Sequence, residues 1–103
     1  MDDNELDLIF KALSDRTRRR IIHYLSKCQD QSLFEVCSAA VAEDGKALAR
    51  QTVSQHLEVL EAAGLIKITW KGRTKAHSLN IEQRHVKATA WLSAYQDKGK
   101  PEQ

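Results

Sequence analysis

The stretch QTVSQHLEVLEAAGLIKITWKGRTKAHSLN, residues 51–80, changes its periodicity at Gly64. Before this glycine, apolar residues recur at spacings of four and three, which is typical of the buried face of an α-helix. After it, apolar and polar residues alternate, which is typical of a β-strand with one covered face. We therefore predict a helix over about 51–63, ended by Gly64, and then a strand. The apolar helix positions are Val53, Leu57 and Leu60.

The basic segment KGRT, residues 71–74, follows the predicted strand directly. Its glycine suits a hairpin turn, and residues 75–80 can return as the antiparallel partner. A helix with a polar outer face followed by a basic hairpin is the arrangement of a helix-turn-helix with a wing.

Three further helices are predicted upstream. The first has roughly ten residues and an apolar stripe at helical spacing. Ser14 or Asp15 can cap the second helix, which should end near residues 26–28. Ser32 and Glu35 are spaced as a capping box for the third. The stripe of the first helix consists of Leu6, Ile9, Phe10 and Leu13.

A last helix is predicted from Ile81 or Glu82 to about Gln96, before a tail at 97–103 that should fray. The expected fold is mostly α with a small β-hairpin, a winged helix-turn-helix in the order α-α-α-α-β-β-α. With 103 residues the chain is long enough for a single domain, whose core should cover about 6–96.

Composition narrows the class of protein. The 42% hydrophobic and 29% charged residues are close to the average of globular proteins. The start of the chain is acidic and lacks the apolar stretch of an export signal or membrane span. Two cysteines are too few for a disulfide framework. We therefore expect a cytoplasmic protein that does not interact with membranes.

The net charge of +2 conceals an uneven distribution. Residues 2–15 carry five acidic side chains and one basic one, whereas residues 46–77 carry six basic side chains and two acidic ones. A basic stripe on a nearly neutral protein indicates an anionic partner for one face.

The first turns of the helix at 51–63 present side chains that hydrogen-bond base edges and phosphates. Gln51 and Gln55 are four residues apart and share one face, with Thr52 and Ser54 beside them. The alternative is the solvated face of an ordinary amphipathic helix. His56 lies at the edge of the apolar stripe, so that both a packed, hydrogen-bonded histidine and a DNA contact stay open.

Two segments carry a resemblance to a known family: ALSDRTRRRIIHYLS at 12–26 and the stretch at 51–80. Together they resemble the ArsR/SmtB family of winged-helix transcriptional repressors, prokaryotic dimers that release operator DNA on sensing a metal, redox or other signal. The most specific part is T-V-S-x-H-L-x-x-L-x-x-A-G-L-I followed by a basic, glycine-containing wing. The resemblance implies a homodimer on double-stranded DNA, with a near-palindromic operator and an unidentified effector.

The family roles transfer to matching positions only. The resemblance implies a recognition helix with Arg50, Gln51, Thr52, Ser54, Gln55 and His56 at the DNA. It implies a wing that touches DNA through Lys71, Arg73 and Lys75. It also implies a dimer interface on the first and last helices, with Leu6, Ile9, Phe10, Leu13, Trp91, Leu92 and Tyr95.

The sequence departs from the family pattern at three places. Ala49 stands where the family usually has Ser or Thr, so that the recognition helix lacks a side-chain cap. The connection over 40–49 is longer than the usual tight turn. Arg16 stands where proline is common.

Cys37 occupies only the second position of the C-x-C that thiol-metal sensors of the family carry, and Glu35 occupies the first. One thiolate does not make a tetrahedral sulfur site. The last helix offers one histidine and no acid after it before Asp97. We therefore predict no metal site and no cofactor. A buried structural thiol is favoured for Cys37, and a reversible Cys28–Cys37 disulfide stays open as a redox alternative.

Two other classes of function are the alternatives to a DNA-binding regulator. The chain has no glycine-rich phosphate loop, no G-x-S-x-G and no paired carboxylates in an apolar setting, so we do not expect an enzyme. A dimeric protein-interaction module that uses the fourth helix for a protein partner is the stronger rival. It predicts binding with little salt dependence, whereas phosphate contacts make DNA binding strongly salt-dependent.

Overall fold

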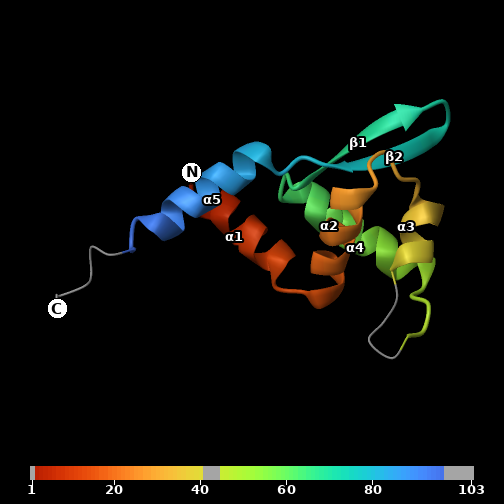
Figure 1. Ribbon diagram of the computed structural model, residues 1–103, viewed down its shortest axis with the longest axis horizontal. Coiled ribbons are helices and arrows are strands. Elements are labelled where there is room, and N and C mark those ends of the chain that lie inside the picture. Colours follow the sequence, from red (N-terminus) through yellow and green to blue (C-terminus); the bar gives the residue numbers. More distant parts are fainter. Residues whose placement is uncertain (1, 41–44, 97–103) are drawn as a thin grey trace.

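The computed structural model describes residues 2–40 and 45–96, and only the backbone of residues 82–86. It confirms the predicted order of five helices and one hairpin (Figure 1). The elements are α1 (Asp3–Leu13), α2 (Arg16–Lys27), α3 (Leu33–Ala39), α4 (Arg50–Ala62), β1 (Ile66–Lys71), β2 (Thr74–Leu79) and α5 (Glu82–Ser93). The predicted frayed tail at 97–103 lies outside the described residues.

Local capping sets the first three helix starts. Asp2 and Glu5 form a capping box on α1, and Ser32 and Glu35 form the predicted box on α3. Of the two cap candidates for α2, Asp15 is the one whose carboxylate accepts the Arg18 N–H.

The ends of the later helices differ slightly from the prediction. Helix α4 begins at Arg50, one residue early, and its N-cap Ala49 provides no side-chain hydrogen bond. Helix α5 ends at Ser93, before the expected Gln96.

The core forms where α4 crosses the other helices. Val53, Leu57 and Leu60 are at most 3% exposed, as their spacing predicted. They pack into a single cluster with apolar side chains of α1, α2, α3 and β1, among them Ile9, Ile21, Leu25, Val36 and Ile66. Burial of this stripe fixes which face of α4 points outward.

The wing is an antiparallel ribbon whose register runs from Ile66–Leu79 to Lys71–Thr74. Gly72 begins the two-residue turn with a φ of +63°, which favours glycine. The predicted alternation of burial holds only near the base of β1, because the ribbon extends past the helices and leaves Trp70 61% exposed (Figure 1).

Strand β2 also lacks alternating burial, but here more residues are buried than alternation predicts. Ala76, His77 and Ser78 are all buried in succession. His77 forms an isolated antiparallel bridge with Gln31, from the connection between α2 and α3. This connection covers the outer edge of β2. Residues of β2 that would face solvent in an alternating strand are therefore buried.

Helices α1 and α5 lie side by side at the end of the molecule away from α3 (Figure 1). The Phe10 and Trp91 rings meet edge to face at 5.8 Å between centroids, and Trp91 and Tyr95 meet in the same way at 5.2 Å. No helix in the described part of the chain combines the length and apolar character that a membrane crossing requires.

Candidate nucleic-acid interface

The outward face of α4 carries most of the side chains predicted to read DNA. Gln51 and Gln55 are exposed, and Thr52 and Ser54 are half-buried on either side of them. Arg50 is exposed at the first position of the helix. Because the buried stripe turns the opposite side of α4 into the core, these polar groups face outward together.

His56 has a different environment from its neighbours on α4. Its side chain is only 18% exposed, and its Nδ1 lies 3.1 Å from an Arg18 guanidinium nitrogen and 3.9 Å from an Asp15 carboxylate oxygen. A guanidinium only donates hydrogen bonds, so Nδ1 of His56 accepts and the ring proton is on Nε2. Of the two roles left open by the sequence, the packed and hydrogen-bonded one is therefore present in the structure.

Two arginines of α2, Arg18 and Arg19, donate hydrogen bonds to the C-terminal end of α1. Arg18 donates from Nε to the Ala12 carbonyl and from Nη2 to the Lys11 carbonyl, each at 2.9 Å. Arg19 donates to the Leu13 carbonyl at 2.7 Å. Arg18 and Arg19 thus bond carbonyls at the C-terminal end of α1, where cations are favoured.

Asp15 caps α2 by accepting a hydrogen bond from the Arg18 N–H. Burial alone would raise the pKa of its carboxyl, but the Arg18 N–H and the neighbouring positive charge outweigh burial, and the net shift of the pKa is downward. Asp15 therefore stays ionised and caps the start of α2 as a carboxylate.

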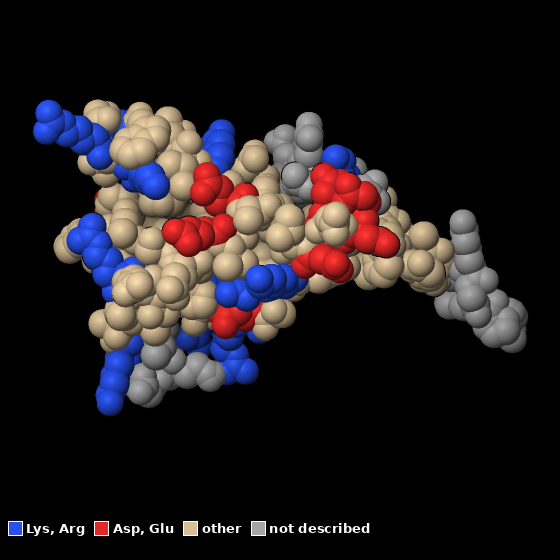
Figure 2. Space-filling view, turned by 180° about the vertical axis from the view of Figure 1, so that it is seen from behind, with Lys and Arg blue, Asp and Glu red and all other residues tan. Residues whose placement is uncertain are grey.

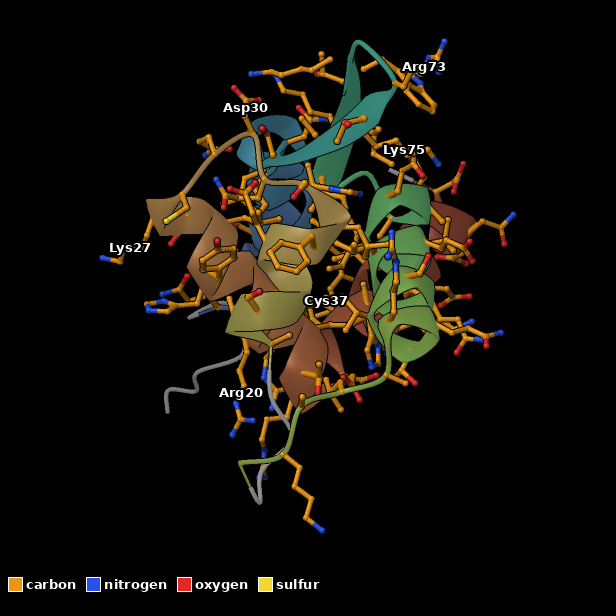
Figure 3. All side chains as sticks on the ribbon, turned by 90° about the vertical axis from the view of Figure 1, so that its right-hand side faces the viewer. Arg20, Lys27, Asp30, Cys37, Arg73 and Lys75 are labelled. Carbon is orange, nitrogen blue, oxygen red and sulfur yellow. The ribbon has the colours of Figure 1, made fainter. Side chains whose placement is uncertain are left out.

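The three wing cations are held in different ways. Arg73 is exposed in the turn and projects from the tip (Figure 3). The Lys75 ammonium lies 5.6 Å from the centroid of the Trp70 ring, within the range of a cation–π contact. The Lys71 ammonium pairs with the Asp30 carboxylate at 3.3 Å.

Asp30, in the connection between α2 and α3, bonds to both strands of the wing. The Asp30 N–H donates to Ser78 Oγ, and Ser78 Oγ donates to the Asp30 carboxylate, each at 2.9 Å. The Ser78 hydroxyl and then the Lys71 ammonium lower the pKa of Asp30. The backbone of Asp30 has a φ of +58°, which Asp tolerates better than most residues.

The roles of Asp30 and Arg18 were not predicted from the sequence. The partners of Asp30 lie 41 and 48 residues further along the chain, and His56 lies 38 residues after Arg18. The sequence hints only weakly at the positive φ of Asp30: the polar stretch Gln29-Asp30-Gln31-Ser32 indicates a connection between helices, and Asp is a residue that tolerates a positive φ. Nothing local separates Arg18 from the arginines beside it.

A groove of about 590 Å³ runs between α3, α4 and the wing. Arg50 and Ser54 line its α4 side, and Arg73 and Lys75 line its wing side. It also contains two carboxylates and two exposed aromatic rings, those of Glu58, Glu61, Phe34 and Trp70. The cations on its two sides can approach one phosphate strand together.

Charge is separated along the molecule. Seen from behind, Lys and Arg lie along the end that carries the wing, whereas the largest group of Asp and Glu lies toward the end with α1 and α5 (Figure 2). Arg20 and Lys27 project from α2 on the side away from α4, whereas Arg73 and Lys75 lie on the α4 side (Figure 3).

The apolar surface at α1 and α5 overlaps only partly with the residues expected in a dimer interface. Leu6 and Ile9 are 5% and 1% exposed, because their side of α1 packs inside the protomer. Leu13 is half-buried. Leu8, which was not predicted, is exposed instead. The exposed apolar side chains of the two helices are Leu8, Phe10, Trp91, Leu92 and Tyr95.

Both cysteines are free thiols and partly buried. Cys37 lies among apolar side chains between α3 and its neighbours (Figure 3). No group of three or more His, Cys, Asp or Glu side chains that could hold a metal occurs among the residues whose side chains are described.

Comparison with known proteins first defines the class. A family model described as a helix-turn-helix domain matches residues 13–69, which include α2, α3, α4 and most of β1. The uncharacterized HTH-type transcriptional regulator YuzN of Bacillus subtilis (strain 168) is 35% identical over 86 residues, covering 84% of this chain and 94% of YuzN. The chain is therefore a helix-turn-helix transcriptional regulator that binds DNA.

Solved structures narrow the class to a family. The crystal structure of the ArsR family transcriptional regulator RHA00566 superposes with a TM-score of 0.77 at 26% identity, over 94% of this chain and 92% of that one. The homodimeric winged helix-turn-helix domain Mb0332 of Mycobacterium bovis shares the fold, with a TM-score of 0.62 at 17% identity over 93% of this chain and 94% of that domain. The protein belongs to the ArsR-type winged helix-turn-helix regulators.

Proposed function

We propose that the protein is a homodimeric repressor that binds a near-palindromic operator, laying α4 of each protomer in a major groove. The observation that carries this proposal is the shared orientation of two surfaces. The hydrogen-bonding side chain of Ser54 on α4 and the cations of Arg50, Arg73 and Lys75 line the same groove. Direct readout needs the first, and phosphate contacts need the second.

The dimer is proposed to form through α1 and α5. Five large apolar side chains are exposed on these two helices in a small chain, which is unusual for a monomer. The Mycobacterium bovis domain with the same fold is homodimeric. A two-fold axis through α1 and α5 sets half-sites about one helical turn, ~34–36 Å, or a multiple of it, apart.

We also infer that the protein acts in the cytoplasm, by binding rather than by catalysis, and that an effector changes its DNA affinity. Cys28 and Cys37 are both free thiols, which makes them candidates for the response to this effector. Operator binding by the reduced protein, the oxidised protein and the protein with thiophilic metals tests whether these cysteines respond to a signal. Equal affinity in all three states would assign the cysteines a structural role.

Base readout is tested with Gln55→Ala on an operator selected from random-sequence DNA. We expect a loss of ~1–3 kcal/mol in operator binding and a relaxed preference at one base pair, with little change on random DNA. Titrations at several salt concentrations provide both affinities. An equal loss on operator and on random DNA would contradict base readout by Gln55.

Phosphate binding by the wing is tested with Arg73→Ala. This change should weaken binding to all sequences and make the dependence of affinity on salt less steep. Lys27→Ala removes one positive charge from the side away from α4, and it is the matched control that should leave the slope unchanged. Salt-independent binding of the unmodified protein would favour a protein partner instead.

A further inference from the structure

We propose that Arg18 and His56 form a positioning pair that fixes the recognition helix α4 against helix α1, and through α1 sets the distance between the two recognition helices of a dimer. The proposal rests on the proposed function. It assigns His56 to the placement of α4 and not to base reading.

All three guanidinium nitrogens of Arg18 have acceptors outside its own helix. Nε and Nη2 donate to the carbonyls of Ala12 and Lys11 in the last turn of α1. Nη1 donates to Nδ1 of His56 on α4. Because the guanidinium is planar and rigid, these three bonds fix α1 and α4 relative to one another.

The bond to His56 depends on one protonation form of the imidazole. Arg18 has no lone pair to offer, so His56 must present a free lone pair at Nδ1. The charged groups near this nitrogen are the Arg18 guanidinium and the Asp15 carboxylate, whose oxygen lies 3.9 Å away. Asp15 also accepts the Arg18 N–H, so the same residue fixes the start of α2 beside the pair.

The position of the pair gives it a functional consequence. His56 directly follows Gln55, yet its side chain is mostly covered while Gln55 is exposed. Helix α1 contacts α5 through the Phe10 and Trp91 rings, in the surface proposed for dimerisation. Arg18 therefore joins the helix pair at the proposed two-fold axis to the helix that enters the groove.

In a two-fold dimer, the separation of the two recognition helices must match the separation of the half-sites. A rigid connection makes binding sensitive to half-site spacing, and a loose one lets each α4 adjust. Loss of the Arg18–His56 bond should therefore relax the spacing preference while leaving the base preference of each half-site unchanged. A residue that only stabilises the fold would alter neither preference.

The test compares two substitutions of His56 in the full-length protein. His56→Asn retains an oxygen acceptor near the place of Nδ1, and His56→Leu removes the acceptor at similar size. Binding is measured on the selected operator and on operators with one to three base pairs inserted between the half-sites. Thermal unfolding without DNA reports whether each variant is folded.

We expect His56→Leu to lose on the order of tenfold in operator affinity and to discriminate less between spacings, and His56→Asn to stay close to the unmodified protein. Arg18→Gln should act like His56→Leu. The double variant Arg18→Gln/His56→Leu should bind the operator no more weakly than the single variant with the lower operator affinity. Additive losses would show that the two side chains act independently and would overturn the proposal.

Two other results would also overturn it. One is an unchanged spacing preference in folded His56→Leu. The other is an equal loss in His56→Asn and His56→Leu, which would point to the imidazole itself at the DNA. Failure of the proposed function is distinguishable from these results, because the unmodified protein would then bind no selected operator at all.

Discussion

The proposed recognition helix α4 and the wing present polar groups to the same groove, but they are attached to the protein in different ways. Helix α4 is held by a stripe of leucine and valine side chains that are at most 3% exposed. The wing is held at β2 by hydrogen bonds from the connection between α2 and α3, centred on Asp30 and Ser78. The proposed reading surface thus rests on the core, whereas the proposed phosphate-binding surface, beyond the buried base of β1 at Ile66, is held by these hydrogen bonds, which we call the polar clamp.

This difference has an energetic side. A buried apolar side chain is stabilised by the removal of its whole surface from water, and its loss also leaves a cavity. A hydrogen bond in the folded protein replaces one with water, so its net contribution is smaller. We therefore expect damage to the α4 anchor to unfold the domain and damage to the wing anchor to loosen the wing alone.

The largest effect should come from Leu60→Ala, at a position that is fully buried in the core. We expect a loss of ~2–5 kcal/mol in the free energy of unfolding, since the substitution removes buried methyl groups and leaves a void. Urea or thermal denaturation measures it. Ala62→Ser, on the exposed side of α4, is a control that should change stability little. A small loss in Leu60→Ala would show that α4 does not depend on this stripe.

A smaller and more local effect is expected from Ser78→Ala, which removes the hydroxyl that bonds both the N–H and the carboxylate of Asp30. We expect a loss of about 1 kcal/mol in the free energy of unfolding. Amide hydrogen exchange should become faster in β1 and β2 and stay unchanged in α4. Ser38→Ala is the control, because the Ser38 hydroxyl bonds only a carbonyl of its own helix. Faster exchange throughout the protein would contradict a clamp that acts on the wing alone.

The same contrast explains which features the sequence could predict. The stripe of α4, the N-cap at Asp15, the capping box at Ser32 and the turn at Gly72 are local patterns, and all are present in the structure. The Asp30–Ser78 clamp joins residues that are 48 positions apart, and the Arg18–His56 pair joins residues 38 apart. No local periodicity encodes such pairs, because each partner is a polar residue of a type that is also common at protein surfaces.

Local periodicity is also insufficient to place the apolar side chains of the first helix. Periodicity identified a stripe containing Leu6, Ile9 and Phe10, but it could not divide the stripe between the protomer core and the outer surface. Only the packing of α1 inside the protomer assigns Leu6 and Ile9 to the interior and leaves Phe10 outside with Leu8. The buried row Ala76–Ser78 breaks the alternation of a strand with one covered face for a similar reason, since the covering segment lies far away in the sequence.

The smallest effect concerns pH and the charge of Asp30. Its pKa is lowered from 3.8 by the Ser78 hydroxyl and the Lys71 ammonium, so the folded state favours the carboxylate. This group therefore stabilises the fold above its unfolded pKa, and the contribution is lost as pH falls from about 3.8 through the lower folded pKa. Asp30→Asn keeps the side-chain shape and tolerates the positive φ but carries no charge. Thermal unfolding should show a lower stability for Asp30→Asn than for the unmodified protein at neutral pH. The two stabilities should converge in strong acid, because Asp30 is then neutral in both the folded and the unfolded state. Asp15, whose pKa is also lowered, is present in both proteins and cancels in the comparison. A difference that persists unchanged into strong acid would show that the clamp depends on the geometry of residue 30 and not on its charge.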